Sequence, residues 1–277
     1  MGVGRRSVVL GVVLLICTSV LVTAQEVAAP AAPSLTREEM ATFLLKARVT
    51  RTRDAGSGVT GSKRVTLTDG TLTHDAHLQS VDVAAPVFEA GRNTELNFKD
   101  TYRYNIAGYR LAQLIGLETV PMSVERNVDG KTASMTWWVD DVKMDEKDRL
   151  KAKTLGPDPV RTSKQIQVMR VFDELIQNRD RNQGNILWTS DFTMWLIDHT
   201  RAFRLGKDLL KPEQLARCDR GLLERLKSLT PESLVQAVGS SLTRLEQEAI
   251  LARRDRIVKL YEDRIARLGE AVVLFAL

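Results

Sequence analysis

The chain has 277 residues, enough for one large bilobed unit or two small domains, and its hydrophobic fraction of 43% suffices for a substantial core. The formal net charge of +5 comes from acids and bases that are mixed along the sequence without a long basic block, so nucleic-acid binding is not indicated. Three histidines and two cysteines are too few and too scattered for a zinc site. Attraction to nucleotide phosphates or acidic membrane surfaces stays open.

An N-terminal export leader is predicted over residues 1–24. Arg5-Arg6 precede an apolar run from Val8 to Val22, and the small residues of Val22-Thr23-Ala24 suit signal-peptide cleavage before Gln25. The mature protein is therefore expected to be periplasmic or extracellular. The alternative is an uncleaved membrane anchor, for which a run of about fifteen residues is short of the roughly twenty that span a bilayer. Membrane contact is expected only in that case.

Residues 25–35 are rich in alanine and proline and predict a flexible spacer between the leader and the folded part. Cleavage of the leader removes Cys17 and leaves Cys218 as the only cysteine. The exported protein is then expected to have no internal disulfide and to depend on packing for its stability. Pairing of Cys218 between two molecules stays open.

Residues 36–141 predict a small β-rich lobe with a packed helix. Asp69-Gly70 and Asp129-Gly130 are strong hairpin signals, because these residue types tolerate the positive φ angles of tight turns. The expected elements in chain order are a helix over Glu38–Ala47, strands over Arg64–Thr68 and Thr71–Val81, a helix over Asn105–Leu114, and strands over Met122–Asn127 and Lys131–Val139.

Residues 142–277 are expected to be mainly helical. Apolar residues recur at helical spacing over Gln165–Gln177, Pro231–Gln247 and Ala252–Leu268, while Asn185–Trp188 and Thr193–Ile197 predict a short hairpin. Burial against the protein's own core is the default for the two C-terminal stretches, and a partner-binding helix is the alternative. With the β-rich lobe, this pattern predicts an α+β fold.

Three polar residues around the short hairpin indicate phosphoryl transfer. Asp180 follows the predicted helix, Asn185 starts the hairpin, and Asp198 follows its end. Asn185 and Asp198 are expected at the same end of the ribbon, where their oxygens can bind the Mg²⁺ ions that bridge the phosphates of ATP. Asp180 would orient or deprotonate an acceptor hydroxyl. The alternative for Asp180 alone is a helix cap or a turn residue.

Two further features suit a nucleotide. In the glycine-rich stretch Gly56–Gly61, Gly58 and Gly61 would let backbone N–H groups approach phosphates, and Lys63 would add positive charge. Trp138 ends the second predicted hairpin at the junction of the two parts, where the chain can meet an adenine ring. The alternatives are turn glycines without a ligand and a tryptophan that packs in the core.

The residues from Gly56 to Phe203 resemble the atypical kinase-like proteins of bacteria, which are related to the phosphatidylinositol 3- and 4-kinase-like, HipA-like and secretory-pathway kinase groups. The most specific matches are Asn178–Leu187, Leu196–Thr200, and Tyr104–Leu117 followed by Val120-Pro121.

This resemblance implies a bilobed protein-kinase-like fold, with an N-lobe over residues 36–141 and a C-lobe with C-terminal helices over residues 142–277. It also implies that Asp180 is the catalytic aspartate and that Asn185 and Asp198 are the metal ligands.

Two positions depart from the family pattern. Gln79 stands where the resemblance places a phosphate-binding lysine, and Asn105 stands where its glutamate partner is expected. The two amides, both assigned to the nucleotide site, can hydrogen-bond each other in place of the ion pair. Loss of the lysine removes a charge that stabilises the transferring phosphoryl group. Lys63, Lys99 and Arg103 are the candidates to compensate.

The sequence therefore predicts an exported, magnesium-dependent phosphotransferase that uses ATP and acts on an unidentified protein or small hydroxylated acceptor. A pseudokinase is the first alternative, a module that binds nucleotide or protein without efficient transfer. The second alternative is an AMP transferase, which differs from a kinase in the mass that it adds to its product.

Overall fold

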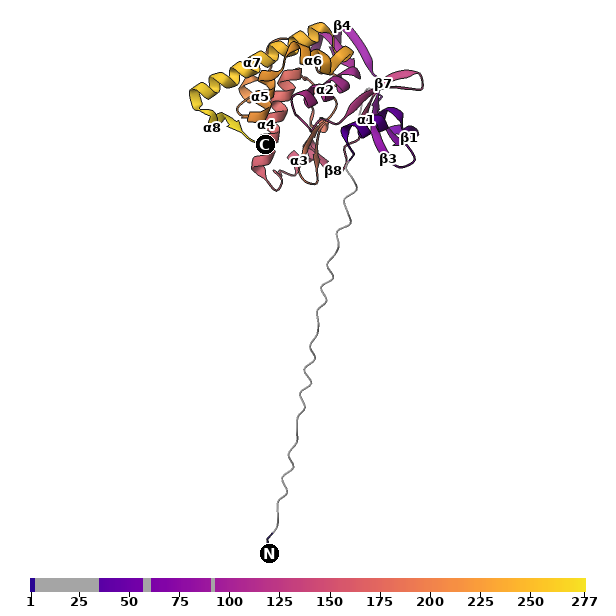
Figure 1. Ribbon diagram of the computed structural model, residues 1–277, viewed down its shortest axis with the longest axis vertical. Coiled ribbons are helices and arrows are strands. Elements are labelled where there is room, and N and C mark those ends of the chain that lie inside the picture. The colour runs from indigo at the N-terminus through magenta and orange to yellow at the C-terminus, as the bar shows by residue number, and fades with distance from the viewer. Residues whose placement is uncertain (3–34, 57–60, 91–92) are drawn as a thin grey trace. The chain divides into compact units, whose positions relative to one another are not determined.

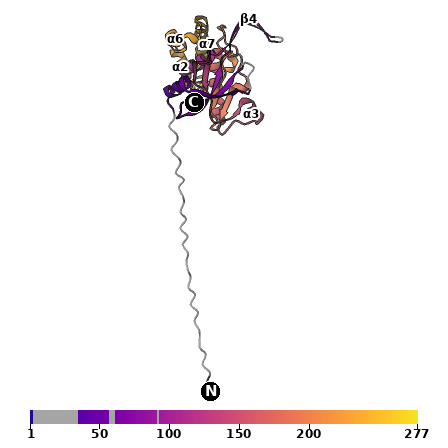
Figure 2. The same ribbon diagram turned by 90° about the vertical axis from the view of Figure 1, so that its right-hand side faces the viewer.

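The computed structural model describes residues 1–2, 35–56, 61–90 and 93–277 (Figure 1 and Figure 2). Nearly all of the predicted leader and spacer lie outside these residues, as does Gly58. From Leu35 to Leu277 the chain forms one compact unit, and its predicted division into two lobes at residue 141 stays a prediction. No helix in the described part of the chain is long and apolar enough to cross a membrane.

An antiparallel sheet of five strands forms the N-terminal part of this unit (Figure 1). Its strands, in spatial order, are β1 (Arg48–Asp54), β2 (Lys63–Thr68), β3 (Thr73–Gln79), β7 (Lys131–Trp137) and β6 (Ser123–Val128). The two predicted hairpins, β2–β3 and β6–β7, are confirmed, and pairing of β3 with β7 joins them. The sequence analysis did not predict β1, whose side chains are mostly exposed and carry no apolar pattern.

Helices α1 (Arg37–Lys46) and α2 (Arg103–Leu114) pack against β6 and β7. A capping box between Thr36 and Glu39 starts α1, because each side chain satisfies a backbone N–H of the other residue. The helix buries its apolar side in a small core with the sheet, which consists of Phe43, Leu44, Ala47, Val65, Leu67, Ala76, Met122 and Met135. Alternate residues of β3 point to opposite faces, so Ala76 faces this core while His77 faces the other way.

A hairpin of β4 (Asp82–Ala90) and β5 (Asn93–Thr101) precedes α2 and was not predicted. Figure 2 shows β4 projecting from the rest of the unit. Val83, Val87 and Leu96 are exposed on it. Because neither face is buried along its whole length, the strands lack the apolar-polar alternation by which a strand is found in a sequence.

The C-terminal part is mainly helical and also contains two small sheets. Strands β8 (Val142–Asp145), β9 (Ile186–Thr189) and β10 (Met194–Leu196) form one sheet, and β11 (Cys218–Asp219) pairs in parallel with β12 (Leu274–Phe275). The helices are α3 (Glu146–Lys151), α4 (Pro159–Ile176), α5 (Arg220–Ser228), α6 (Pro231–Val238), α7 (Arg244–Leu268) and α8 (Glu270–Val273), with 3-10 turns η1 (Gln183–Asn185), η2 (Pro212–Gln214) and η3 (Gly239–Ser241). The predicted α+β class is confirmed.

The prediction of one helical stretch over Pro231–Gln247 is wrong in its boundaries. Helix α6 ends before Gly239, whose φ of 52° lies in the left-handed region that glycine tolerates. A new helix starts after Thr243, which forms a capping box with Glu246. The chain therefore turns between α6 and α7, and α7 continues without a break through the predicted stretch from Ala252 to Leu268.

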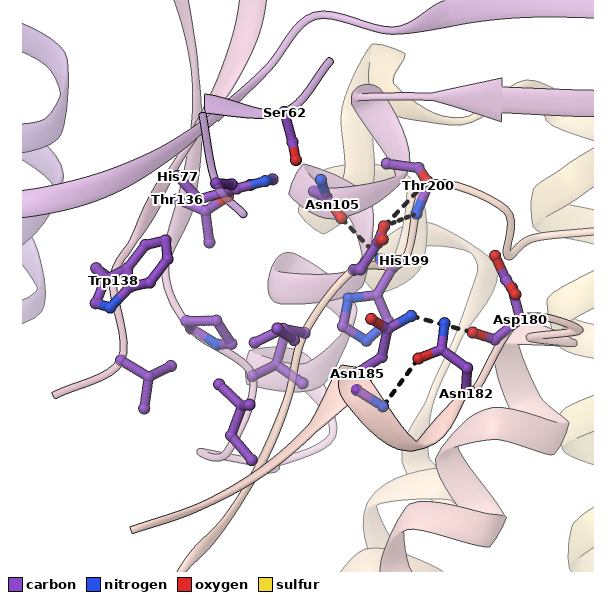
Figure 3. A pocket seen from close by; sticks show the side chains of 18 of the residues that line it. Ser62, His77, Asn105, Thr136, Trp138, Asp180, Asn182, Asn185, His199 and Thr200 are labelled. Atoms are coloured by element: carbon purple, nitrogen blue, oxygen red, sulfur yellow. Dashed lines mark hydrogen bonds between the residues drawn. The ribbon is translucent and has the colours of Figure 1, made fainter. Parts of the chain in front are cut away.

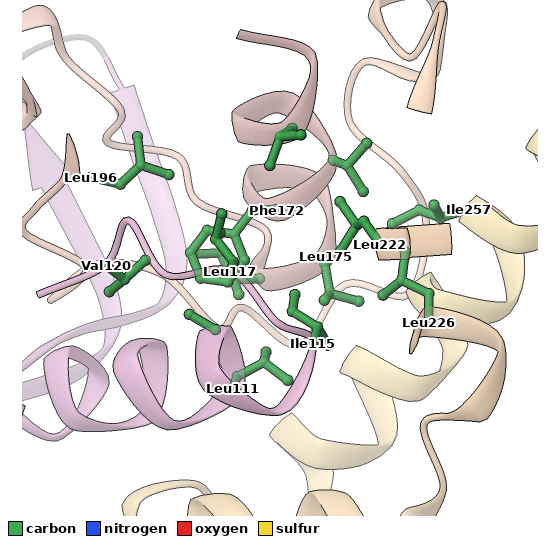
Figure 4. Packing of buried hydrophobic residues seen from close by; sticks show 14 of the residues in the cluster. Leu111, Ile115, Leu117, Val120, Phe172, Leu175, Leu196, Leu222, Leu226 and Ile257 are labelled. Carbon is green, nitrogen blue, oxygen red and sulfur yellow. The ribbon is translucent and has the colours of Figure 1, made fainter. Parts of the chain in front are cut away.

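One large apolar core joins α2 to the C-terminal helices. Figure 4 shows Leu111 of α2 and Ile115, the residue just after this helix, beside Phe172 and Leu175 of α4. The same core includes Leu196, Leu222, Leu226 and Ile257, which come from β10, α5 and α7. Because these segments lie far apart in the sequence, burial of their side chains fixes the position of α2 relative to the helical part.

The sole cysteine of the predicted mature chain is inaccessible. Cys218 is a free thiol at the start of β11 and is fully buried. Burial raises the pKa of its thiol to about 12, and the neighbouring Asp219 carboxylate acts in the same direction. The folded unit thus offers no thiolate at Cys218 for pairing between molecules.

Candidate functional site

A cavity of about 370 Å³ is lined by residues from both parts of the unit (Figure 3). Figure 3 shows His77 and Trp138 on the sheet side of the cavity and Asp180 and Asn182 on the opposite side. Its described polar and aromatic lining consists of Ser62, His77, Asp100, Asn105, Thr136, Trp137, Trp138, Asp180, Asn182, Asn185, Asp198, His199, Thr200 and Arg201. The three residues predicted for catalysis and metal binding are thus brought to one cavity.

Asp180 and Asn185 lie in the turn between α4 and β9. Gln177 ends α4 in a left-handed conformation, with a φ of 48°, and the side-chain oxygen of Asn178 accepts from the Asp180 N–H at 2.9 Å. The Asn185 side-chain N–H donates to the Asp180 carbonyl at 3.2 Å, which turns the amide oxygen of Asn185 away from that carbonyl. The turn thereby sets the orientation of a side-chain oxygen, which is the ligand type that hard divalent cations prefer.

Arg181 holds this turn to the neighbouring strands, a role that the sequence analysis missed. Its guanidinium donates to the carbonyls of Asn185 and Ile197 at 3.1 and 2.8 Å. It also pairs with the Asp173 carboxylate at 3.0 Å. Asn185 and Ile197 lie at the open end of the β9–β10 pair. Because Arg181 binds the carbonyls of both residues, it keeps Asn185 close to Asp198, which follows Ile197 in the chain.

Asp198 adopts a left-handed backbone conformation with a φ of 53°, which is uncommon for a residue with a side chain. The Thr200 hydroxyl donates to its Oδ1 atom at 3.0 Å, and the Thr200 N–H contacts the same atom at 3.4 Å. These contacts orient the carboxylate of an otherwise exposed residue. Backbone strain of this kind recurs at functional sites, where the surrounding structure maintains it.

Helix α2 holds the residue that follows Asp198. The Asn105 side-chain oxygen accepts from the His199 N–H at 2.8 Å, and the Asn105 side-chain nitrogen lies 3.4 Å from the Ser134 hydroxyl. One turn later, a Cβ atom at Gly108 would lie 3.1 Å from Cγ of His199. The imidazole is fully buried, and burial lowers its pKa well below the usual value, so it is neutral near pH 7. Asn105 thus binds the backbone of His199, and Gly108 leaves room for its imidazole ring.

We expect Gly108→Ala to destabilise the protein by about 1–3 kcal/mol, because the added methyl group crowds the His199 ring inside a packed core. Alanine in a helix is otherwise favoured over glycine by roughly 1 kcal/mol. The matched control is Gly221→Ala in α5, where the nearest atoms are the end of the Arg225 side chain and the capping oxygen of Asp219, each at 3.2 Å, and no buried ring is contacted. Urea unfolding of both variants tests this, and equal stability of Gly108→Ala and wild type would contradict a close contact.

Asp100 is a carboxylate in the cavity that sequence reasoning missed. It lies near the end of β5, and the Thr101 N–H next to it donates to the Thr200 carbonyl at 2.9 Å. Burial raises the pKa of Asp100, and the Asp198 and Asp180 carboxylates raise this pKa further. The hydrogen bond with Thr200 and the charge of Arg201 lower it. The polar sequence around Asp100 gave no signal that its side chain is enclosed.

Strand β5 also positions the cation of the site. Arg201 pairs with Glu95 of β5 at 3.0 Å and approaches the Asp180 carboxylate at 3.5 Å. Its guanidinium lies 5.2 Å from the ring centre of Phe98, and Arg204 contacts the same ring and pairs with Glu95 at 2.6 Å. The hairpin that the sequence analysis missed therefore fastens the segment after Asp198.

Some of the residues predicted to bind the nucleotide line the cavity, and others do not. Trp138 and Asn105 line the cavity. Gly61 has a φ of 68° and precedes Ser62, which lines the cavity, whereas Lys63 forms an ion pair with Asp54 at 2.6 Å and is not among the described lining residues.

Gln79, predicted at the lysine position, is buried and accepts from the Val81 N–H at 3.2 Å, and the described cavity lining does not include it. His77, two residues earlier on the same face of β3, lines the cavity instead. Burial lowers the pKa of His77, and the Asp198 carboxylate opposes this shift. No lysine occurs among the described lining residues, so Arg201 is their one permanently charged cation.

The donors around the cavity fit a hard divalent cation. Asp198 offers a carboxylate, Asn185 an amide oxygen and Asp100 a second carboxylate. Within the described ranges, no three His, Cys, Asp or Glu side chains are gathered as a ready-made metal cluster. Mg²⁺ characteristically binds through one or two carboxylates and takes its remaining ligands from water and substrate phosphates. The donor set therefore suits a cation that binds together with a nucleotide better than a structural metal.

Three solved structures share this fold, and two of them are of kinases. The hydra Fam20 protein, solved with a sugar, matches 86% of this chain over 92% of its own length, with a TM-score of 0.64 and 13% identity. The Golgi casein kinase with Mn and ADP bound matches 86% of this chain over 78% of its own, with a TM-score of 0.63 and 14% identity. The Helicobacter pylori proinflammatory kinase CtkA matches 81% of this chain over 98% of its own, with a TM-score of 0.52 and 9% identity.

No protein-family model matches the sequence, and no curated protein matches it. At 9–14% identity the structural likeness shows the fold alone. The chain has the bilobed, atypical kinase-like fold that its sequence predicts, with a β-rich N-terminal part and a helical C-terminal part.

Proposed function

We propose that the protein is an exported, magnesium-dependent phosphotransferase that moves the γ-phosphoryl group of ATP to a hydroxyl group. One observation carries the proposal: Asp180, Asn185 and Asp198 line a single cavity in a kinase-like fold. The Golgi casein kinase structure, which holds Mn and ADP, supports a nucleotide and a divalent cation as the ligands of such a fold.

Each residue has a defined part in the proposed reaction. The acceptor oxygen forms a bond to the γ-phosphorus, the bond from that phosphorus to the β–γ bridging oxygen breaks, and ADP leaves. Asp180 orients the acceptor hydroxyl and takes its proton. Asn185 and Asp198 hold a Mg²⁺ ion, which when bound neutralises charge on the phosphates. Arg201 beside Asp180 adds positive charge where the transferred group passes.

The sheet side of the cavity suits the nucleoside. Trp138 presents an aromatic surface to the cavity. The guanidinium of Arg64 lies over the Trp138 ring, 4.1 Å from its centre. A base can stack on such a ring. The predicted leader supports export, and the acceptor is assigned only by class, as a protein or small molecule with a free hydroxyl group. We also propose that the chain is related to the phosphatidylinositol 3- and 4-kinase-like and HipA-like groups, which its motifs resemble.

A nucleotide-binding protein without efficient transfer is the second candidate. The described cavity lining has no lysine, and Arg201 is already paired with Glu95 and lies close to Asp180. Contacts that stabilise charge on the transferring group commonly contribute about 3–4 kcal/mol to the barrier, so their absence slows transfer severely. Mass spectrometry of the products distinguishes the candidates, because phosphoryl transfer, AMP transfer and no transfer give different masses.

The proposal predicts magnesium-dependent binding of ATP that requires Asp198. Calorimetric titration of the wild-type protein should show ATP binding with Mg²⁺ and binding weaker by about tenfold or more without it. The Asp198→Ala variant should lose this dependence, because the carboxylate that holds the ion is gone. Asp263→Ala, which changes an exposed acid of α7 paired with Lys259, is the matched control and should bind as wild type does. A folded wild-type protein that binds no ATP would refute the proposal.

A further inference from the structure

The cavity contains a buried carboxylate oxygen without a partner. Asp100 is only 6% exposed, and within the described ranges its Oδ1 atom has no hydrogen-bond donor. Burying an ionised carboxylate without a compensating partner is strongly unfavourable. Asp100 shares the cavity with Asp180 and Asp198, so the local charge is already negative. An unpartnered acid in such a place is explained when a ligand supplies the missing positive charge.

The nearest hydroxyl cannot supply what Asp100 lacks. Thr200 interacts with the Asp100 carboxylate, but its hydroxyl donates to Oδ1 of Asp198 at 3.0 Å. A hydroxyl group has a single proton to donate, so it serves one of the two carboxylates at a time. Thr200 thus contacts both Asp100 and Asp198, which brings the two carboxylates near each other in the cavity lining.

The nearby cations of the protein are committed elsewhere. Arg201 pairs with Glu95 at 3.0 Å and approaches Asp180 at 3.5 Å. Lys99 precedes Asp100 in β5, and because adjacent strand residues point to opposite faces, it pairs with Glu246 at 2.8 Å on the other side. The charge of Arg201 offsets part of the cost of burying Asp100, but the ion pairs of Arg201 are with Glu95 and Asp180, and Lys99 is directed to the other face of the strand.

We propose that Asp100 and Asp198 together bind one divalent cation, with Thr200 as the spacer that sets their separation. The inference rests on the proposed function, because phosphate oxygens of the nucleotide and water would complete the coordination. In nucleotide sites, Mg²⁺ is bound by one or two carboxylates together with phosphate oxygens and water. Strand β5, outside the segment that carries Asp180, Asn185 and Asp198, thus becomes part of the metal site.

Manganese binding tests this assignment without an activity assay. The electron paramagnetic resonance signal of free Mn²⁺ falls as the ion binds, and titrations are run on the purified protein with and without ADP. Asp100→Asn keeps the size of the side chain and removes its charge, and we expect Mn²⁺ affinity to fall by about tenfold to a hundredfold. The control is Asp82→Asn, which changes an acid of the same hairpin that is 47% exposed and lies 3.8 Å from Arg103. Its Mn²⁺ affinity should equal that of wild type.

The unfolding temperature provides a second readout. Without metal, Asp100→Asn should melt at or above the wild-type temperature, because an uncompensated negative charge is removed. Added Mn²⁺ should raise the melting temperature of wild type and of Asp82→Asn but not that of Asp100→Asn. Should Asp100→Asn fail to fold by circular dichroism, Asp100→Ser, with a small neutral side chain, takes its place in both measurements.

The outcomes separate this inference from the proposed function. Loss of Mn²⁺ binding in Asp100→Asn and in Asp198→Ala supports both. Wild-type affinity in Asp100→Asn with loss in Asp198→Ala overturns the role of Asp100 and leaves the proposed function intact. Wild-type affinity in both variants overturns the metal site itself.

Discussion

Asp180→Asn should slow phosphoryl transfer by about 10²- to 10⁴-fold, the range that general-base groups contribute. The amide has nearly the size of the carboxylate but cannot accept the proton of the acceptor hydroxyl. The Asp180 carboxylate lies 3.5 Å from Arg201, and the backbone N–H of Asp180 donates to the Asn178 side chain. Because the substitution leaves this backbone hydrogen bond in place, the turn is expected to keep its shape. Transfer is measured as the rate of labelled product formation from γ-labelled ATP, with the protein itself or a screened acceptor as substrate.

Binding must be measured beside transfer for this result to identify a chemical role. ATP affinity of Asp180→Asn should stay close to wild type, because the cation is assigned to other residues. Asp208→Asn is the control, since this side chain is 87% exposed and pairs with Arg256 away from the cavity. If Asp180→Asn transfers phosphate at the wild-type rate, Asp180 is a turn residue without a catalytic role.

Arg253→Ala should lower the free energy of unfolding by about 3–5 kcal/mol, which is the scale for removing one member of a buried charged hydrogen-bond network. Arg253 in α7 is fully buried, and burial lowers the pKa of its guanidinium to about 10. It donates to the carbonyls of Leu175 and Arg204 at 2.8 and 2.9 Å and also to that of Gly206. Truncation leaves these acceptors unsatisfied and creates a cavity.

Arg256→Ala supplies the comparison for the stability measurement. Arg256 lies three residues after Arg253 in α7 and is 53% exposed, with a surface ion pair to Asp208 at 3.0 Å. Its loss should change stability by no more than about 0.5 kcal/mol. Denaturant unfolding followed by circular dichroism gives both values. Similar small losses in the two variants would show that Arg253 is not a structural link between α7 and the segment after the site.

Local signals in the sequence were sufficient for much of the fold and for the three central site residues. The Asp-Gly turns located both hairpins of the large sheet, because their residue types determine the turn without help from distant contacts. The spacing of Asp180, Asn185 and Asp198 likewise depends on one turn and one short hairpin. The boundary after α6 was missed although Thr243 and Glu246 form a capping box, since apolar periodicity continued across it.

The remaining site residues depend on contacts between distant parts of the chain. Asp100 is enclosed because β5 lies along the segment that includes Thr200, and no pattern near Asp100 encodes that approach. His77 rather than Gln79 lines the cavity because of where β3 meets β7, which is a matter of strand register. Arg253 stands in a run of charged residues, a pattern typical of a solvated helix face, yet its guanidinium is buried against carbonyls from two other segments.

The segment from His199 to Arg204 has a consequence for how the protein would be controlled. In many kinases, the stretch after the metal-binding aspartate swings between two positions and is set by phosphorylation. Here Asn105 holds one end of that stretch, Glu95 and Phe98 hold its arginines, and Arg253 binds its last carbonyl. Under the proposed function, this segment would need no switch after folding, and the rate of transfer would follow the local supply of nucleotide and cation.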